Sequence, residues 1–270
     1  MTNQKVLLDG SNPDVFLECY VADPTKDFVR DAMLVIPGGG YYDVCADREG
    51  EPIALAFLGR GMNAFVLHYS VKEKAKFPQP LLEASKAVKY IRDHAKEFQT
   101  NPDRIFACGF SAGGHLCAAL GTLWHKPEIY EAAGLSYGEN KIAGMLPIYP
   151  VISGILPGTH MGSFQNLLGS QSPTREELER YSLERCVDEH TVPAFLVHTA
   201  EDQAVGADNS LVFAQALIRC KIPCELHLYP KGPHGIALAN RITWGGNPGY
   251  LLPNAEKWVD QAMEWMGRLS

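Results

Sequence analysis

The sequence lacks any long apolar run. No window approaches the roughly 18 uninterrupted apolar residues that cross a bilayer, and residues 1–9 lack the apolar stretch of a signal peptide. We therefore expect no membrane partner and a cytoplasmic location.

Basic residues are few and scattered, with 24 Lys and Arg against 31 Asp and Glu, a formal net charge of −7. The densest basic stretch, residues 72–76, is interrupted by Glu73. Binding a nucleic-acid backbone needs a continuous basic face. Nucleic acid is therefore not an expected partner.

The seven cysteines form no C-x-x-C pair and no cluster with histidine at metal-ligand spacing. Neither a disulfide framework nor a metal site is indicated. Hydrophobic residues make up 46% of the chain, which is ample for a core, and 270 residues amount to fewer than two domains of about 150 residues. We predict a single domain over residues 1–270.

Short apolar runs alternate with helical patterns, which is typical of a mostly parallel sheet with crossover helices. A leading hairpin is expected from residues 5–8 and 15–20, joined by turn residues 9–13. The further strand candidates are residues 32–36, 64–68, 105–109, 144–149, 194–199 and 225–229. The helix candidates are residues 81–98, 112–123, 211–219 and 255–269.

Residues 153–188 break this alternation and are rich in Gly, Ser and Glu. They contain one clear helix start, at which Thr174 can cap the helix while Glu177 reaches back as a capping box. Because the segment follows one strand candidate and precedes the next, we predict a small cap over a pocket at the carboxyl edge of the sheet.

A Gly-Phe-Ser-Ala-Gly pentapeptide at residues 109–113 carries the strongest chemical signal. It follows an apolar strand and opens a helix of small residues, as a nucleophile turn requires. Glycines on both sides let the backbone bend and present the Ser111 hydroxyl above the sheet.

A serine hydroxyl is a weak nucleophile and needs a base, which a carboxylate then orients. His234 follows the last strand candidate and is favoured over His115 and over His198, which lies inside an apolar strand. Asp202 lies just past residues 194–199 and is preferred to the competing carboxylates Glu201 and Asp208. The order Ser, Asp, His is the one that an α/β-hydrolase sheet produces.

Three consecutive glycines at residues 38–40 follow the first parallel strand candidate. Backbone N–H groups without neighbouring side chains can approach a substrate oxygen and stabilise its developing charge. The candidate donors to this oxyanion are the N–H groups of Gly39, Gly40 and Ala112. No phosphate-binding glycine pattern follows the strand.

From about residue 15 to the end, the chain resembles the acetyl-esterase and hormone-sensitive-lipase-like branch of the α/β-hydrolases. It is similar in particular to small bacterial acetylxylan-esterase-like, or xylanase-like, proteins. The resemblance rests on the segments 37–41, 109–115, 200–205 and 233–235. It implies Ser111 as nucleophile, His234 as base, Asp202 as its partner, esters of short acyl groups as substrates, and no metal or cofactor.

One position departs from the family: Pro37 stands where many relatives have His ahead of the glycines. Proline has no N–H and a fixed φ, so whatever that histidine braces must be held differently here.

The expected activity is hydrolysis of short-chain esters, acetylated sugars among them, by a serine carboxylesterase. Tyr41, Tyr42 and Trp244 are candidate substrate-binding residues, and Phe164, Leu167 and Leu168 could line the pocket or pack the cap. Two alternatives stay open: an amidase of the same fold, such as an arylformamidase or a peptidase, and a non-catalytic binding protein. The oligomeric state is also open, a homodimer included.

Overall fold

One mixed sheet organises the chain, as the computed structural model shows for residues 1–8, 10 and 12–269. Its strand order is β1-β2-β4-β3-β5-β6-β7-β8. β2 runs antiparallel to β1 and β4, and the pairings from β4 through β8 are parallel. The strands are β1 (Thr2–Leu7), β2 (Phe16–Val21), β3 (Arg30–Ile36), β4 (Asn63–His68), β5 (Thr100–Phe110), β6 (Gly144–Ile148), β7 (Ala194–Thr199) and β8 (Cys224–Tyr229).

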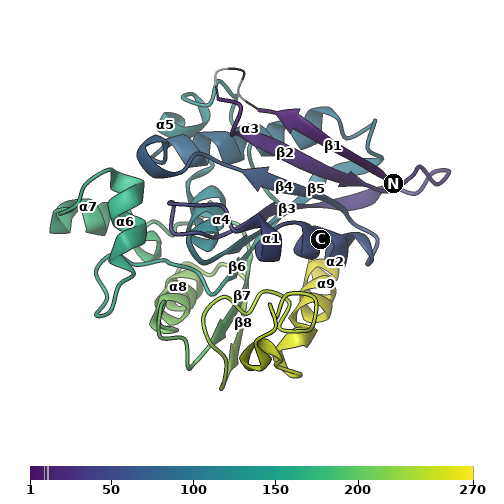
Figure 1. Cartoon of the computed structure of the whole chain (residues 1–270). Helices are drawn as coiled ribbons and strands as arrows, with labels where there is room; N and C mark the ends of the chain where they lie inside the picture. Colours follow the sequence, from purple (N-terminus) through teal and green to yellow (C-terminus); the bar gives the residue numbers. More distant parts are fainter. Residues whose placement is uncertain (9, 11, 270) are drawn as a thin grey trace.

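Helices connect the parallel strands and cover both faces of the sheet (Figure 1). They are α1 (Ala46–Glu49), α2 (Glu51–Leu58), α3 (Gln79–Asp93), α4 (Ser111–Leu123), α5 (Pro127–Tyr130), α6 (Met161–Leu168), α7 (Arg175–Arg180), α8 (Asp208–Arg219) and α9 (Trp258–Arg268). Short 3₁₀ turns lie at Lys72–Lys74, Leu183–Arg185, Pro248–Tyr250 and Ala255–Lys257.

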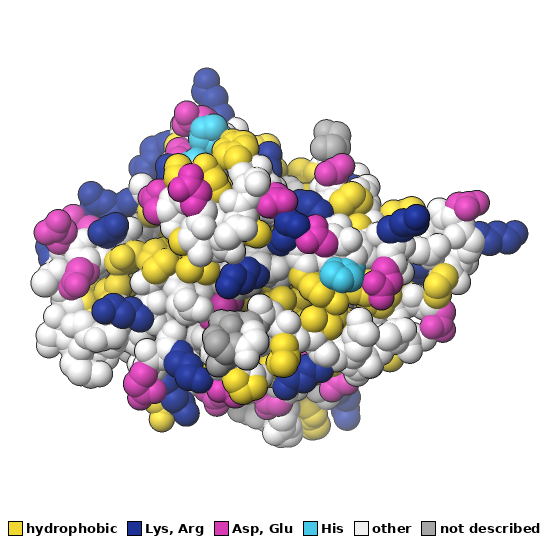
Figure 2. Space-filling model, turned by 90° about the horizontal axis from the view of Figure 1, so that it is seen from above, with side chains coloured by type: hydrophobic (Ala, Val, Ile, Leu, Met, Phe, Trp, Pro, Cys, Tyr) yellow, Lys and Arg dark blue, Asp and Glu magenta, His cyan; other side chains and the backbone are white. Residues whose placement is uncertain are grey.

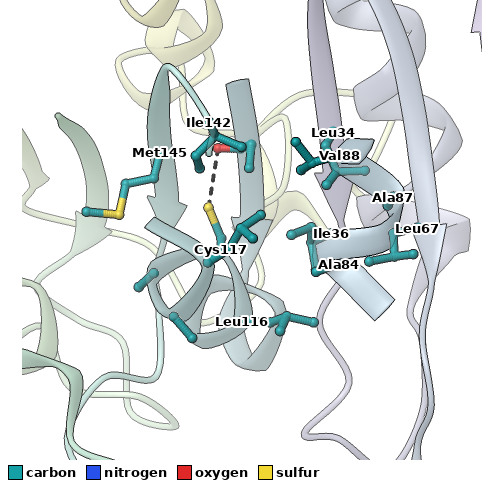
Figure 3. Close-up of a cluster of buried hydrophobic side chains, with 14 of the residues drawn as sticks. Leu34, Ile36, Leu67, Ala84, Ala87, Val88, Leu116, Cys117, Ile142 and Met145 are labelled. Carbon is teal, nitrogen blue, oxygen red and sulfur yellow. Dashed lines mark hydrogen bonds between the residues drawn. The ribbon is translucent and has the colours of Figure 1, made fainter. Parts of the chain in front are cut away.

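The core lies in two layers, one on each face. Apolar side chains of α3, α4 and α8 pack on one face of the strands, and those of α2 and α9 pack on the other. Figure 3 shows part of the first layer, where Val88 and Ala84 of α3 lie over Leu34 and Ile36 of β3. In the same layer the Cys117 thiol donates to a backbone carbonyl of β5 at 3.3 Å.

The predicted α/β-hydrolase architecture is confirmed, and so is the leading antiparallel hairpin, although Asp9 and Ser11 of its predicted turn lie outside the described residues. The helix predicted over residues 81–98 is too long, because α3 ends at Asp93. Beyond it the chain turns so that Phe98 packs on Phe65 of β4 with ring centroids 5.4 Å apart, and β5 begins at Thr100.

The segment 153–188 holds α6 and α7, which project to one side of the sheet (Figure 1). The capping box predicted at the start of α7 is present: the Thr174 hydroxyl accepts from Glu177 N–H, and the Glu177 carboxylate accepts from Thr174 N–H. The helix α6 was not predicted.

Charged side chains of both signs are interspersed over the face of the molecule that Figure 2 shows. Among the helices of the described residues, none combines the length and the apolar character that crossing a bilayer requires.

Candidate active site

The turn between β5 and α4 holds Ser111 in a left-handed conformation, with φ +53°. Both glycines of the pentapeptide are needed for close approach. A Cβ on Gly109 would lie 2.2 Å from the Gly113 carbonyl oxygen, and one on Gly113 would lie 2.2 Å from the Ile36 carbonyl oxygen. The turn therefore packs on itself and against the end of β3 so closely that neither position has room for a side chain.

His234 and Asp202 meet Ser111 at this edge of the sheet. The Ser111 Oγ lies 2.8 Å from His234 Nε2, and His234 Nδ1 lies 2.6 Å from Asp202 Oδ2. An ionised carboxylate can only accept, so Nδ1 carries the proton and Nε2 accepts from the hydroxyl. The structure thus brings together the three residues that the sequence singled out.

The Asp202 carboxylate is fixed by its own backbone and by a second histidine. Its Oδ1 accepts from the N–H groups of Ala204 and Val205, at 3.0 and 2.9 Å. Its Oδ2 lies 3.4 Å from Nε2 of the fully buried His198. Burial opposes the charged form, but hydrogen bonds from His198 and His234 outweigh it and hold the pKa of Asp202 below its usual value.

The competing residues lie elsewhere. His115 is buried between the Tyr41 hydroxyl, 2.9 Å from its Nδ1, and the Tyr181 carbonyl, 3.0 Å from its Nε2. The carboxylate of Glu201 accepts a long hydrogen bond from Gly232 N–H at 3.4 Å. Asp208 begins α8 and is exposed.

The loop after β3 that holds Gly38, Gly39 and Gly40, called the glycine loop below, approaches Ser111 from the other side. Gly39 and Gly40 have φ of +126° and +66°, and their N–H groups donate to no acceptor among the described residues. Ala112 lies in the first turn of α4. The loop is braced around Pro37 by the Tyr69 hydroxyl, which donates to the Pro37 carbonyl at 2.8 Å, and by Glu49, which accepts from Gly38 N–H at 2.8 Å.

A cavity of about 560 Å³ opens over the Ser111 hydroxyl. Its walls come from the glycine loop, α1, α6 and the loop after β8. They consist of Gly39, Gly40, Tyr42, Cys45, Arg48, Glu49, Ser111, His160, Gly162, Asn166, His234, Gly235 and Tyr250. A larger cavity, about 1110 Å³, lies at the opposite edge of the sheet, beside the residues that precede β6, β7 and β8. The relay, by which we mean Ser111, His234 and Asp202, contributes no residue to its walls.

Of the three candidate substrate-binding residues, only Tyr42 lines the cavity over Ser111, and it is 60% exposed. Tyr41 is 1% exposed because its ring packs against Tyr69 and His115. The Trp244 ring lies outside the cavity, beneath the Arg241 guanidinium at 5.5 Å. Assigning Tyr41 and Trp244 to substrate is thus not supported by their positions.

The segment 153–188 reaches the cavity through α6. Phe164 and Leu167 are buried against the body of the protein. They thus pack the segment onto the sheet and do not line the pocket. Asn166 donates from Nδ2 to the Gly40 carbonyl at 2.8 Å, so α6 holds the glycine loop directly. His160, whose pKa is lowered by burial and by the nearby His234, hydrogen-bonds through Nδ1 to the Ser163 hydroxyl.

Sequence reasoning missed Arg48, Glu49, His160, Asn166 and Tyr250 at the cavity. They lie in helices of at most eight residues and in loops, where no residue pattern marks a site. Within the described part of the chain, no three His, Cys, Asp or Glu side chains gather as they would to hold a metal ion.

Comparison with known proteins identifies the family. The BD-FAE family model matches residues 17–217. The endo-1,4-β-xylanase B of Butyrivibrio fibrisolvens is 40% identical over 89% of this chain and 37% of its own length. The acetylxylan esterase of Xylanibacter ruminicola is 28% identical over 84% of this chain and 45% of its own length. The chain thus spans less than half the length of these two curated relatives.

Solved structures match the whole chain rather than a part of it. The acetyl ester-xyloside bifunctional hydrolase of Caldicellulosiruptor lactoaceticus is 33% identical, covers 96% of both chains and superposes with a TM-score of 0.79. Other matching structures are described as an α/β hydrolase and as a carboxylesterase. The chain therefore belongs to the BD-FAE family and, as the sequence resemblance predicts, has the α/β-hydrolase fold.

Proposed function

We propose that the protein is a serine carboxylesterase that hydrolyses short-chain esters, acetyl esters of sugars among them, through an acyl-enzyme. The observation that carries the proposal is the continuous relay from the Ser111 hydroxyl through His234 to Asp202 at 2.8 and 2.6 Å, at the floor of an open cavity. A hydroxyl paired with an oriented imidazole is the arrangement that acyl transfer needs.

In the first step Ser111 Oγ attacks the ester carbonyl carbon while His234 Nε2 takes the hydroxyl proton. The tetrahedral intermediate collapses, the bond from carbon to the alkoxy oxygen breaks, and His234 returns its proton to the leaving alcohol. Water then attacks the acyl-enzyme in the same way, which releases the carboxylic acid and restores the Ser111 hydroxyl. Asp202 stays ionised and stabilises the imidazolium in both steps.

The N–H groups of Gly39, Gly40 and Ala112 are the donors proposed for the oxyanion. Their support is that the N–H groups of Gly39 and Gly40 donate to no acceptor among the described residues, although both glycines line the cavity beside Ser111. Donors already fixed in place stabilise the transition state without reorganisation, and each contributes roughly 10²–10³ in kcat.

The cavity walls favour a short acyl group and a polar alcohol. No Leu, Ile, Val, Met or Phe is among the lining residues that the structure describes. Two tyrosines, Tyr42 and Tyr250, and hydrogen-bonding side chains such as Arg48 and Asn166 suit a sugar, which presents apolar faces and hydroxyl edges. The relatives described as an acetylxylan esterase and an acetyl ester-xyloside hydrolase support the same choice.

We further propose that residues 153–188 act as a cap within a single domain of residues 1–270. Support comes from α6, which contributes Gly162 and Asn166 to the cavity wall and bonds to the glycine loop. An acetylated oligosaccharide would then approach Ser111 between this cap and the loop that carries Tyr250.

Hydrolysis of p-nitrophenyl acetate, butyrate and octanoate by wild type and Ser111→Ala tests the proposal. We expect turnover that falls with chain length and that is lost in the variant. An N-formyl arylamine and a dipeptide, assayed beside the esters, separate the amidase alternative. Equal background rates with wild type and variant on every substrate would leave the non-catalytic binding protein as the better account.

A further inference from the structure

The buried carboxylate of Glu49 takes no part in the relay from Ser111 to Asp202. Glu49 ends α1, is 4% exposed, and lies in the wall of the cavity. Its Oε2 accepts from the N–H of Gly38 at 2.8 Å, and its Oε1 accepts from the Tyr149 hydroxyl at 2.8 Å. Both oxygens are thus engaged, one of them by the glycine loop itself.

Tyr149 continues this connection to the loop that carries the catalytic histidine. Its hydroxyl accepts from the N–H of Ala237 at 3.0 Å, and its ring lies edge-on to the His234 imidazole with centroids 5.1 Å apart. Tyr149 follows β6 and is 1% exposed, so its hydroxyl has no access to water as an alternative partner. One hydroxyl therefore joins Glu49 to the histidine loop.

The protons in this chain of contacts can be placed without ambiguity. Gly38 and Ala237 each have one N–H to donate, and the only proton of the Tyr149 hydroxyl goes to Glu49. An ionised carboxylate satisfies every bond, whereas a protonated one would leave a donor without an acceptor. Burial raises the pKa of Glu49 above its usual value, and the hydrogen bonds from Gly38 and Tyr149, which favour the charged form, offset this only in part.

The neighbouring residue Arg48 makes a second tie from the same short helix. Its Nη2 donates to the Gly235 carbonyl at 3.1 Å, and its guanidinium lies over the Tyr250 ring at 5.1 Å. A Cβ on Gly235 would lie 2.7 Å from Arg48 Nη2, and one on Gly38 would lie 2.8 Å from Glu49 Oε2. Glycine at both positions lets α1 sit directly between the two loops.

We propose that Glu49, acting through Tyr149, is a positioning residue that locks the glycine loop and the histidine loop in a fixed relation around Ser111. The oxyanion donors and the imidazole must face the same reacting carbon, and misplacement of one by about 1 Å costs roughly 10²-fold in rate. The catalytic consequence rests on the proposed function, whereas the mechanical link between the loops does not.

The first test is kinetic and compares Tyr149→Phe, which keeps the ring and removes the hydroxyl, with Tyr229→Phe. The Tyr229→Phe change also removes a hydroxyl bond, a partly buried one of 2.7 Å to Gln261, but Tyr229 takes no part in the site. On p-nitrophenyl acetate we expect kcat of Tyr149→Phe to fall roughly 10- to 100-fold with KM within about twofold. The control should keep wild-type kcat. A kcat for Tyr149→Phe equal to that of the control would overturn the proposal.

Glu49→Gln provides an independent variant. The amide oxygen can accept from the Gly38 N–H, but the amide nitrogen that then faces Tyr149 cannot accept the hydroxyl proton. We expect a similar loss in kcat. The double variant with Tyr149→Phe should be no slower than the slower single variant, since both changes break one chain of contacts. Fully additive losses would show that the two residues act separately, which contradicts the proposal.

Hydrogen–deuterium exchange separates this inference from the proposed function. In Tyr149→Phe we expect faster exchange in two peptides, the one that covers residues 37–45 and the one that covers residues 232–239. In Tyr229→Phe we expect both peptides to exchange as in wild type. Faster exchange confined to residues 232–239 would show that the loops are not linked. If wild type hydrolyses no ester while both loops loosen together, the proposed function fails and the link between the loops stands.

Discussion

Ser111 Oγ and His234 Nε2 lie 2.8 Å apart although 123 residues separate them in the chain. Ser111 follows β5, Asp202 follows β7 and His234 follows β8. Because these strands are parallel, their carboxyl ends share one edge of the sheet, and three distant segments converge there. The hydroxyl of Thr199 fixes the histidine loop further by donating to the Gly232 carbonyl at 2.8 Å.

Asp202→Asn should lower kcat roughly 10⁴-fold with little change in KM, because the amide cannot hold the His234 Nδ1 proton as a carboxylate does. Steady-state kinetics on p-nitrophenyl acetate measure the effect. Asp208→Asn, at the exposed start of α8, is the matched control and should behave as wild type. The assignment is wrong if Glu201→Gln abolishes turnover while Asp202→Asn retains it.

Gly113→Ala should destabilise the fold by about 1–3 kcal/mol, because the added Cβ meets the carbonyl oxygens of Ile36 and Pro37 at 2.2 and 2.3 Å. Gly267→Ala is the matched control: it lies on the exposed side of α9 with nothing within 4 Å of an added Cβ. Helix propensity alone should then stabilise the protein by about 1 kcal/mol. Urea unfolding measures both, and a Gly113→Ala variant as stable as wild type would contradict the packing of the turn.

Asn166→Ala should lower kcat roughly fivefold, because one hydrogen bond to the Gly40 carbonyl contributes about 1 kcal/mol to holding the glycine loop. Asn166→Asp should lower it further, since a carboxylate oxygen then faces a carbonyl oxygen. Gln165→Ala is the control, because that side chain, on the same helix, bonds instead to the Gln171 carbonyl at 2.8 Å. Equal kcat values for all three variants would show that α6 does not brace the loop.

The sequence predicted the sheet and the three residues of the relay because each signal was local. The strands are short apolar runs, and Ser111, Asp202 and His234 each follow such a run at a turn marked by small or polar residues. The rule that parallel strands end at one edge supplied the remaining step. The predicted strand boundaries lie within three residues of the observed ones except at the start of β5, which begins five residues earlier than predicted, and Ala194–Thr199 matches to the residue.

What the sequence could not reveal are contacts between segments without periodicity. Glu49 lies four residues past a cysteine in a short helix, and nothing local indicates that its carboxylate is buried between two loops. Tyr41 is a candidate substrate-binding residue by sequence, but its ring packs inward, edge-on to His115. Both outcomes depend on tertiary packing that adjacent residues do not encode.

His115 should make the stability of the protein depend on pH in mildly acidic solution. Burial lowers its pKa from 6.5 to about 4, although its hydrogen bond to the Tyr181 carbonyl opposes this. Between those values the unfolded chain binds a proton that the native protein does not, so the free energy of unfolding falls as pH falls. The full loss amounts to about 3 kcal/mol.

His115→Gln removes this titration while its amide can still accept from Tyr41 and donate to Tyr181, so urea unfolding at pH 7 and at pH 4.5 should show a smaller difference for the variant than for wild type. Other groups that titrate in this range are common to both proteins and cancel in the comparison. An unchanged difference in His115→Gln would mean that the native protein protonates His115 as readily as the unfolded chain does, with Nδ1 donating to the Tyr41 hydroxyl instead of accepting from it.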